Sequence, residues 1–178
     1  MERRDFIIKS SQVMTVAMFL NLIGTENLLA KTNHNPLKRP LIDDFKKPIH
    51  KAIALGINAA SPQNIQSWKF KLISDSEMYL YIDENKLLSA SDPLARQIHI
   101  AAGCFIETLY IGISKYGYKA NILYFPEGYN SSVDFGIKPI AQISLTKQDK
   151  GEHLLSSYIH TRQTNRKQYR GDYISMIE

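Results

Sequence analysis

Residues 92–117 constrain the fold more than any other segment, because they predict one long helix with apolar residues on almost every face. These apolar residues are Ile98, Ile100, Ala101, Ala102, Cys104, Phe105, Ile106, Leu109, Ile111 and Ile113. Asp92 is a favoured N-cap, Pro93 suits the first turn, and Gly117 suits the helix end. A helix that is apolar all round has to be buried on all sides. One sheet cannot cover it, so we expect a central helix with another half or another subunit against it.

Short alternating segments around this helix predict strands. Residues 68–74 and 78–83 alternate between apolar and polar side chains, and the short turn between them predicts an antiparallel pair. Residues 119–125 and 139–145 are the next predicted strands. The sequence therefore predicts an α+β fold, with an antiparallel or mixed sheet around a long buried central helix.

Two further helices are predicted. The first begins at Asp43 or Asp44, either of which can cap it, and its apolar residues recur with the helical period. It ends near Ala60, because Pro62 biases the residue before it away from the helical conformation. Residues 152–160 resemble the start of the second helix.

Composition limits the classes of protein and of site. The 178 residues, 44% apolar and 22% charged, are typical of one globular domain rather than of a disordered chain. Cys104 is the only cysteine, which excludes an internal disulfide and a thiolate zinc cluster, and its apolar neighbours indicate a small buried residue. The histidines lack metal-binding spacing, so we expect no metal site, and we interpret His99 as a structural residue. The net charge of +5 favours acidic ligands only weakly.

The first thirty residues have the layout of an export signal. A basic start precedes an apolar run over residues 13–23, and the small residue Ala30 follows. The letters RRDFI at positions 3–7 resemble the twin-arginine signal, which carries folded proteins, often with a cofactor already bound. We therefore expect an exported, periplasmic protein with no stable membrane span after removal of residues 1–30, or a membrane-tethered one if the signal is not cleaved. The alternative is an amphipathic helix docked on the domain. Residues 31–41 are interpreted as a linker.

A polar segment, residues 59–68, lies between a predicted helix end and a predicted strand. It is rich in serine and amide side chains, yet it ends in the only tryptophan, Trp68. Amide groups present both hydrogen-bond donors and acceptors, which suits the edge of a heterocycle such as the flavin ring. The alternative is an ordinary connector in which Asn64 and Gln66 bond to the backbone.

A basic segment, residues 160–169, comes much later in the chain. Arg162, Arg166 and Lys167 surround Thr164 in this segment. Two guanidinium groups and a hydroxyl suit a phosphate monoester, because arginine can donate two parallel hydrogen bonds to its oxygens. The alternative is a solvated basic turn. We expect no nucleic-acid partner, because aromatic residues do not alternate with the basic ones as they do in a stacking platform.

Together these two segments resemble the flavin-dependent nitroreductases. The letters ASPQNIQSW at positions 60–68 resemble the A-P-S-x-N-x-Q-P-W segment of that family, and RQTNR at positions 162–166 resembles its R-R-S-x-R phosphate motif. Residues 92–117 are similar to the long helix of the family's dimer core. The arginine motif comes first in ordinary members but last here, which is the order of the tandem-repeat, Acg-like branch. In that branch two halves within one chain imitate the dimer.

The resemblance implies an FMN site and an oxidoreductase activity. The residues carried over are Arg162, Thr164 and Arg166 for the phosphate and ribityl chain, and Ser61, Asn64 and Gln66 for the isoalloxazine ring. NAD(P)H would be the electron donor, and a nitroaromatic, a quinone or a similar small molecule would be the acceptor. This chemistry needs no acid–base side chain, so no catalytic residue is assigned. Thr164 stands where the family has serine, and serine and proline are exchanged at positions 61 and 62.

The resemblance also implies a domain organisation. Residues 42–160 would form one nitroreductase-like half, and residues 161–178 would begin a second half. The partner of the first half would be that second half or a second copy in a homodimer. A tandem protein of this kind is longer than 178 residues. We therefore expect this chain to be a fragment of a larger protein and to be inactive by itself.

Two alternatives to the enzyme stay open. One is a flavin-sequestering or sensing protein without turnover, which would keep its flavin oxidised in the presence of both NADH and NADPH. The other is an exported α+β domain whose basic cluster binds a different anion, which would bind phosphate but not flavin.

Overall fold

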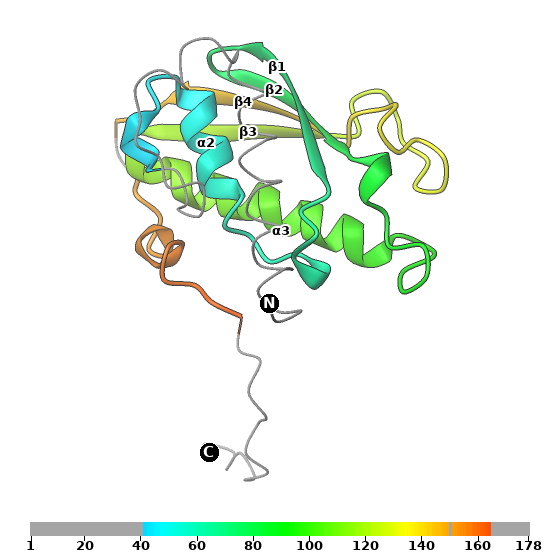
Figure 1. Ribbon diagram of the computed structural model, residues 1–178. Helices are drawn as coiled ribbons and strands as arrows, with labels where there is room; N and C mark the ends of the chain where they lie inside the picture. Colours follow the sequence, from blue (N-terminus) through cyan, green and yellow to red (C-terminus); the bar gives the residue numbers. More distant parts are fainter. Residues whose placement is uncertain (1–40, 150, 165–178) are drawn as a thin grey trace, which may run out of the picture.

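The computed structural model describes residues 41–149 and 151–164 (Figure 1). The predicted export signal, nearly all of the predicted linker and residues 165–178, including Arg166, lie outside the described residues. The described elements are, in chain order, η1 (Ile42–Asp44), α2 (Pro48–Gly56), η2 (Pro62–Asn64), β1 (Trp68–Ser74), β2 (Glu77–Ile82), η3 (Glu84–Lys86), α3 (Arg96–Ile113), η4 (Ser114–Tyr116), β3 (Tyr118–Tyr124), β4 (Ala141–Lys147) and η5 (Ser156–Tyr158), where η denotes a 3-10 helix.

The strands form one antiparallel sheet in the order β1-β2-β4-β3. Alternate residues of the central strands are buried, among them Met78 and Leu80 on β2 and Ile143 on β4. One face of the sheet therefore belongs to the core, and the other carries polar side chains such as Lys69 and Lys71. The α+β class predicted from the sequence is confirmed.

Helices α2 and α3 pack against each other and over the apolar face of the sheet (Figure 1). Phe105, in the middle of α3, is fully buried, and its ring centroid lies 5.1 Å from that of Trp68 and 5.2 Å from that of Phe70. Gly56 permits the close approach of α2, because a Cβ atom at this position would lie 2.5 Å from the Phe105 ring. Phe105 thus joins both helices and the edge strand β1 in one core.

Helix α3 is buried on one side only in the described part of the chain. Ile98, Leu109 and Ile113 are fully buried, whereas Ile100 is 55% exposed and Tyr110 is 37% exposed. Within the described residues, α2 and the sheet contact this helix, and the side that carries Ile100 and Tyr110 is left open. Burial on all sides was predicted only with a second half or a second copy against the helix, so it stays a prediction.

Helix α2 is shorter than predicted. It begins at Pro48, because proline is pre-organised for the first turn of a helix but cannot continue one. The predicted acidic caps lie instead in the separate turn η1. The helix ends at Gly56, and the Asn58 side chain then donates hydrogen bonds of 2.9 and 3.0 Å to two carbonyl oxygens of the last turn.

Helix α3 begins at Arg96 rather than at Asp92, yet Asp92 still caps it. The Asp92 Oδ2 atom accepts hydrogen bonds from the backbone N–H groups of Gln97 at 2.8 Å and Ile98 at 3.2 Å. Ala95, which lies between Asp92 and the first residue of the helix, has a left-handed backbone with φ of 51°. This turn lets the carboxylate fold back over the helix start, so the capping residue is as predicted and the helix boundary is not.

The four predicted strands are present with ends shifted by at most two residues. The helix predicted over residues 152–160 is reduced to η5. Ser156 and Ile159 are buried there, whereas Leu154 is 90% exposed. Its apolar side chains therefore do not form the continuous stripe that stabilises a longer helix.

Candidate functional site

Residues 61–66, which we call the amide loop, connect the region after α2 to β1. Gln63, Asn64 and Gln66 have left-handed backbones, with φ of 49°, 58° and 51°. For residues other than glycine this conformation costs roughly 1–2 kcal/mol each, with asparagine at the lower end. Strain of this kind persists only where surrounding contacts fix it, and it is concentrated at functional sites.

Hydrogen bonds within the amide loop bring three predicted site residues together. The Ser61 Oγ atom accepts a hydrogen bond from the Gln66 backbone N–H at 3.3 Å. The Gln66 Nε2 atom donates to the Asn64 Oδ1 atom at 3.4 Å. Asn64 is exposed, and Ser61 and Gln66 are half-buried. The Gln66–Asn64 bond joins two side chains, so the loop presents a pair of linked amides rather than side chains bonded only to backbone.

Lys86 connects the amide loop to the segment after β2. Its Nζ atom donates a hydrogen bond to the Gln66 backbone carbonyl at 3.4 Å. The side chain is half-buried, and this burial lowers the pKa of Lys86, while the nearby Asp83 carboxylate acts in the opposite direction. Lys86 was not predicted from the sequence, because a single lysine after a strand belongs to no spacing pattern.

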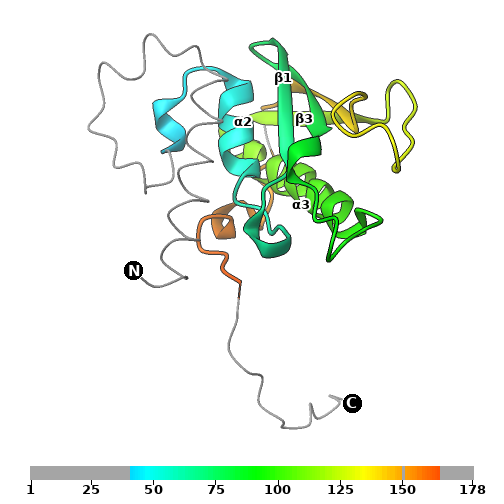
Figure 2. The same ribbon diagram turned by 45° about the vertical axis from the view of Figure 1, so that its right-hand side comes forward.

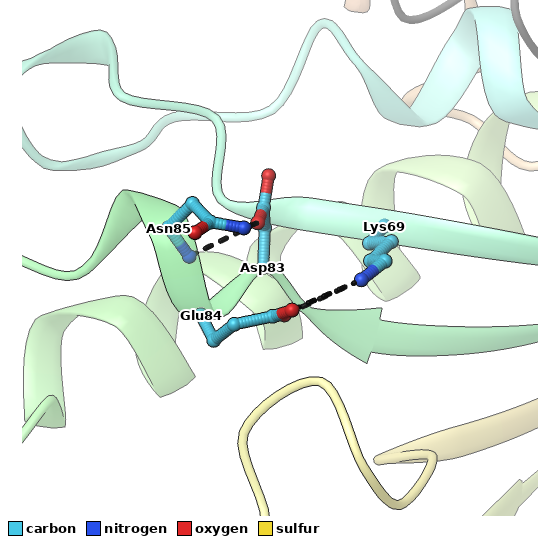
Figure 3. A network of polar contacts seen from close by, with 4 residues as sticks. All are labelled: Lys69, Asp83, Glu84 and Asn85. Carbon is cyan, nitrogen blue, oxygen red and sulfur yellow. Dashed lines mark hydrogen bonds and ion pairs between the residues drawn. The ribbon is translucent and has the colours of Figure 1, made fainter.

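Polar contacts hold the short helix η3 that carries Lys86 (Figure 3). The Asp83 Oδ1 atom accepts from the Asn85 backbone N–H at 3.1 Å and from its Nδ2 atom at 3.3 Å. The Lys69 Nζ atom, on β1, lies 3.2 Å from Glu84 Oε1. A backbone hydrogen bond within Glu84, and then the bond to Lys69, lower the pKa of the Glu84 carboxyl. The three residues before Lys86 are thus held by contacts with one another and with β1.

Arg162 lies against the chain just before the amide loop. Its Nε atom donates to the Asn58 backbone carbonyl at 3.1 Å, across 104 positions in the sequence. Its Nη1 atom donates to the Thr164 Oγ1 atom at 3.4 Å. Asn58 precedes Ser61 by three positions, so the structure brings the described part of the basic segment close to the amide loop. Arg166 lies outside the described residues.

A buried isoleucine anchors the chain that leads to Arg162. Ile159 is 6% exposed, and its Cδ1 atom lies 2.7 Å from the position that a Cβ atom at Gly112 would take. The segments η2 and η5 both contact α3. Both lie below the sheet, with η5 near the left-hand end of α3 and η2 farther to the right in Figure 1 (Figures 1 and 2).

Trp68 ends the polar segment but does not belong to the site. It is 4% exposed, and its ring packs against Phe105 and not among the amides. The polar segment therefore changes from a loop with exposed amides to a core strand within two residues of Gln66.

His99 has the contacts of a structural histidine, as predicted. Its Nδ1 atom lies 2.7 Å from the Ala95 carbonyl oxygen, and its Nε2 atom lies 3.2 Å from the Tyr129 hydroxyl. The Nδ1–H tautomer satisfies both contacts, with the tyrosine hydroxyl as donor to Nε2. Burial, and then the Asp134 carboxylate, raise the pKa of Tyr129 to about 12, which keeps this hydroxyl protonated.

The described ranges hold neither a metal cluster nor a membrane-spanning helix. No group of three or more histidine, cysteine, aspartate or glutamate side chains there is placed to hold a metal ion. No helix in the same ranges combines the length and the apolar character needed to cross a bilayer.

Comparison with known proteins gives a weak similarity and no family. No protein-family model matches the sequence. Two uncharacterized proteins of Mycobacterium tuberculosis, MT3212 from strain CDC 1551 / Oshkosh and Rv3127 from strain H37Rv, are each 26% identical to this chain over 111 residues. The match covers 58% of this chain and 32% of each relative. The chain thus spans about a third of the length of the curated relatives that it matches.

Proposed function

We propose that this chain contributes one side of an FMN site in an oxidoreductase of nitroreductase type. NAD(P)H is the proposed electron donor, and a nitroaromatic, a quinone or a similar small molecule is the proposed acceptor. The observation that carries the proposal is the 3.1 Å hydrogen bond from Arg162 to the Asn58 carbonyl. It joins a phosphate-binding type of side chain, from a distant part of the sequence, to the chain three positions before the amide loop.

The described part of the basic segment fits a phosphate group. The two bonds of Arg162, to Asn58 and Thr164, use two of the five N–H donors of a guanidinium. Arg162 and Thr164 are exposed, so a phosphate can reach both side chains from solvent. Arg162 would donate to the phosphate oxygens, and the Thr164 hydroxyl would add a further hydrogen bond. Arg166 is the proposed second cation of this group.

The amide loop fits the edge of a heterocycle. Its linked Asn64 and Gln66 side chains offer N–H donors and carbonyl acceptors, and the Ser61 hydroxyl holds the Gln66 backbone in place. The strained backbone is fixed before any ligand binds, which lowers the entropy cost of binding. When bound, FMN would supply the hydride-transfer chemistry, while the protein binds and orients it.

The partner and the location belong to the same proposal. The open side of α3, which exposes Ile100 and Tyr110, is the proposed contact surface for a second nitroreductase-like half or for a second copy of the chain. Export to the periplasm by the N-terminal segment is proposed on the sequence pattern alone.

A titration of the full chain with FMN tests the binding part of this proposal. Arg166→Ala should raise the Kd for FMN roughly thirtyfold, because the loss of a charged hydrogen bond to phosphate costs about 2 kcal/mol. Lys119→Ala, which removes an equal charge from an exposed position on β3, should leave the Kd unchanged. A protein that binds phosphate but retains no flavin after unbound FMN is removed would contradict the proposal.

Anaerobic reduction tests the oxidoreductase part. NADH or NADPH should bleach the absorbance of the bound flavin, and an added quinone should restore it. Flavin that stays oxidised with both donors would overturn the enzyme and leave a flavin-sequestering protein.

A further inference from the structure

Lys86 has a placement that the proposed function does not use. It extends from η3, after β2, and donates to the carbonyl of Gln66 at 3.4 Å. Gln66 therefore has its backbone held on both sides, at the N–H by Ser61 and at the C=O by Lys86. Gln66 is also one of the left-handed residues of the amide loop, with φ of 51°.

A left-handed glutamine needs such restraints. Without them an L-residue relaxes toward negative φ, which would turn the Gln66 carbonyl and move its side chain away from Asn64. The two restraints differ in kind, because the Ser61 contact is local and the Lys86 contact comes from another part of the fold. Lys86 is therefore a side-chain restraint on Gln66 itself, next to the backbone hydrogen bond of 2.8 Å that the Asp83 N–H donates to the Ser67 carbonyl.

Polar contacts hold the three residues before Lys86. Asp83 caps the turn by accepting from Asn85, and Lys69 on β1 pairs with Glu84 (Figure 3). The three residues before Lys86 thus follow directly on β2 and are joined to β1 by the Lys69–Glu84 pair. A half-buried lysine on such a base places its ammonium group at a defined position.

We infer that Lys86 is a positioning residue, which holds the amide loop in its left-handed conformation and supplies positive charge at the loop. The positioning role stands by itself, whereas the effect of the charge on a bound flavin rests on the proposed FMN site. Reduced flavin carries negative charge on its ring, so a fixed cation at the amide loop stabilises the reduced form more than the oxidised form. The charge of Lys86 therefore raises the midpoint potential of the bound flavin.

The first experiment needs no flavin. Amide hydrogen exchange across residues 61–67 is measured in the full chain for the wild type, Lys86→Met, Lys86→Arg and the control Lys71→Met. Lys71 is an exposed lysine on β1, and methionine preserves the apolar stem of either side chain. Exchange in the loop should rise about tenfold in Lys86→Met, stay near the wild-type rate in Lys86→Arg, and stay unchanged in Lys71→Met. Equal exchange in Lys86→Met and the wild type overturns the positioning role.

The second experiment measures the midpoint potential of bound FMN in the same four proteins. Lys86→Met should weaken binding of reduced relative to oxidised flavin about tenfold, which is a fall of about 30 mV for a two-electron couple. Lys86→Arg and Lys71→Met should keep the wild-type potential, and a role in folding alone would not produce this pattern. An unchanged potential in Lys86→Met overturns the charge role while the FMN site stands. If the wild type binds no FMN, the proposed function and the charge role both fail, and the exchange experiment alone decides the positioning role.

Discussion

The amide loop leads within two residues to Trp68, which belongs to the core around Phe105, but the loop and the core are held by different forces. Trp68 packs on Phe105 at 5.1 Å between centroids, and both rings are buried. Two positions earlier, Gln66 is held by hydrogen bonds of 3.3 and 3.4 Å with a strained backbone. The apolar contacts of the core stabilise the folded chain, whereas the left-handed backbone of the loop lowers the free energy of unfolding.

This difference separates the part that specifies the fold from the part that is available for binding. Burial of apolar area is non-directional, so it stabilises the packing of α2, α3 and the sheet without regard to a ligand. The loop keeps polar groups at defined positions near the surface, where a small number of hydrogen bonds can be exchanged for bonds to a ligand. Substitutions in the core should therefore mainly lower the free energy of unfolding, and substitutions in the loop should mainly lower the affinity for a ligand.

The largest effect on stability is expected from Phe105→Ala. It removes a fully buried ring and leaves a cavity between both helices and β1, so the free energy of unfolding should fall by about 3–5 kcal/mol. Chemical denaturation of the full chain measures this, with Tyr124→Ala at an exposed position of β3 as the control. A loss below about 1 kcal/mol would show that Phe105 is not the centre of the core.

A smaller loss is expected from Asp92→Ala. This change removes the carboxylate that accepts from the N–H groups of Gln97 and Ile98, so the free energy of unfolding should fall by about 1–2 kcal/mol. Glu107→Ala, at an exposed position of the same helix, is the control and should change it by less than about 0.5 kcal/mol. Equal effects of the two substitutions would contradict the capping role.

The core also contains a polar group whose effect depends on pH. His50 is buried beside Phe45, and its Nε2 atom has no hydrogen-bond partner among the described residues. Burial, and then the Lys47 ammonium, lower the pKa of His50 from its ordinary 6.5, although Asp75 opposes them.

The unfolded chain therefore binds a proton at His50 more readily than the folded chain does. Its contribution to stability is complete above pH 6.5 and is lost as the pH falls below that value. Denaturation midpoints between pH 7.5 and about 5.5 measure this effect. Aspartate and glutamate side chains ordinarily titrate below this range, so they contribute little to the change. The decline should become shallower in His50→Gln, and an equal decline in both proteins would contradict the assignment.

The smallest effect on stability is expected in the amide loop itself. Gln63→Gly should change the free energy of unfolding by no more than about 0.5 kcal/mol, because relief of the left-handed strain offsets the extra entropy of an unfolded glycine. The same denaturation assay measures it. A loss above about 1 kcal/mol would mean that the loop contributes to the core and not mainly to a site.

The strands and the long helix could be predicted because their signals are local. Alternation identified β1 and β2 within one residue at each end, and the apolar run identified α3. The start of α2 was misplaced because Pro48 overrides the acidic caps before it, and the start of α3 because Ala95 turns the chain between Asp92 and the helix.

The candidate site was predictable only in part. Composition singled out the amide loop and the basic segment, and the contact between Arg162 and Asn58 joins them in space. The left-handed backbone of Gln66 and the contact of Lys86 depend on residues 20 positions apart that share no motif. Such tertiary contacts leave no periodic pattern in the sequence.

The most direct test compares FMN with riboflavin, which has the same ring but no phosphate. Affinities of both are measured for the full chain, Arg162→Ala and Asn64→Ala. We expect that the wild type prefers FMN and that Arg162→Ala loses most of this preference by weakening FMN binding alone. Asn64→Ala should weaken the binding of both ligands by a similar factor. Equal weakening of both ligands by Arg162→Ala, or no weakening of riboflavin by Asn64→Ala, would contradict the assignment of phosphate to the basic segment and of the ring to the amide loop.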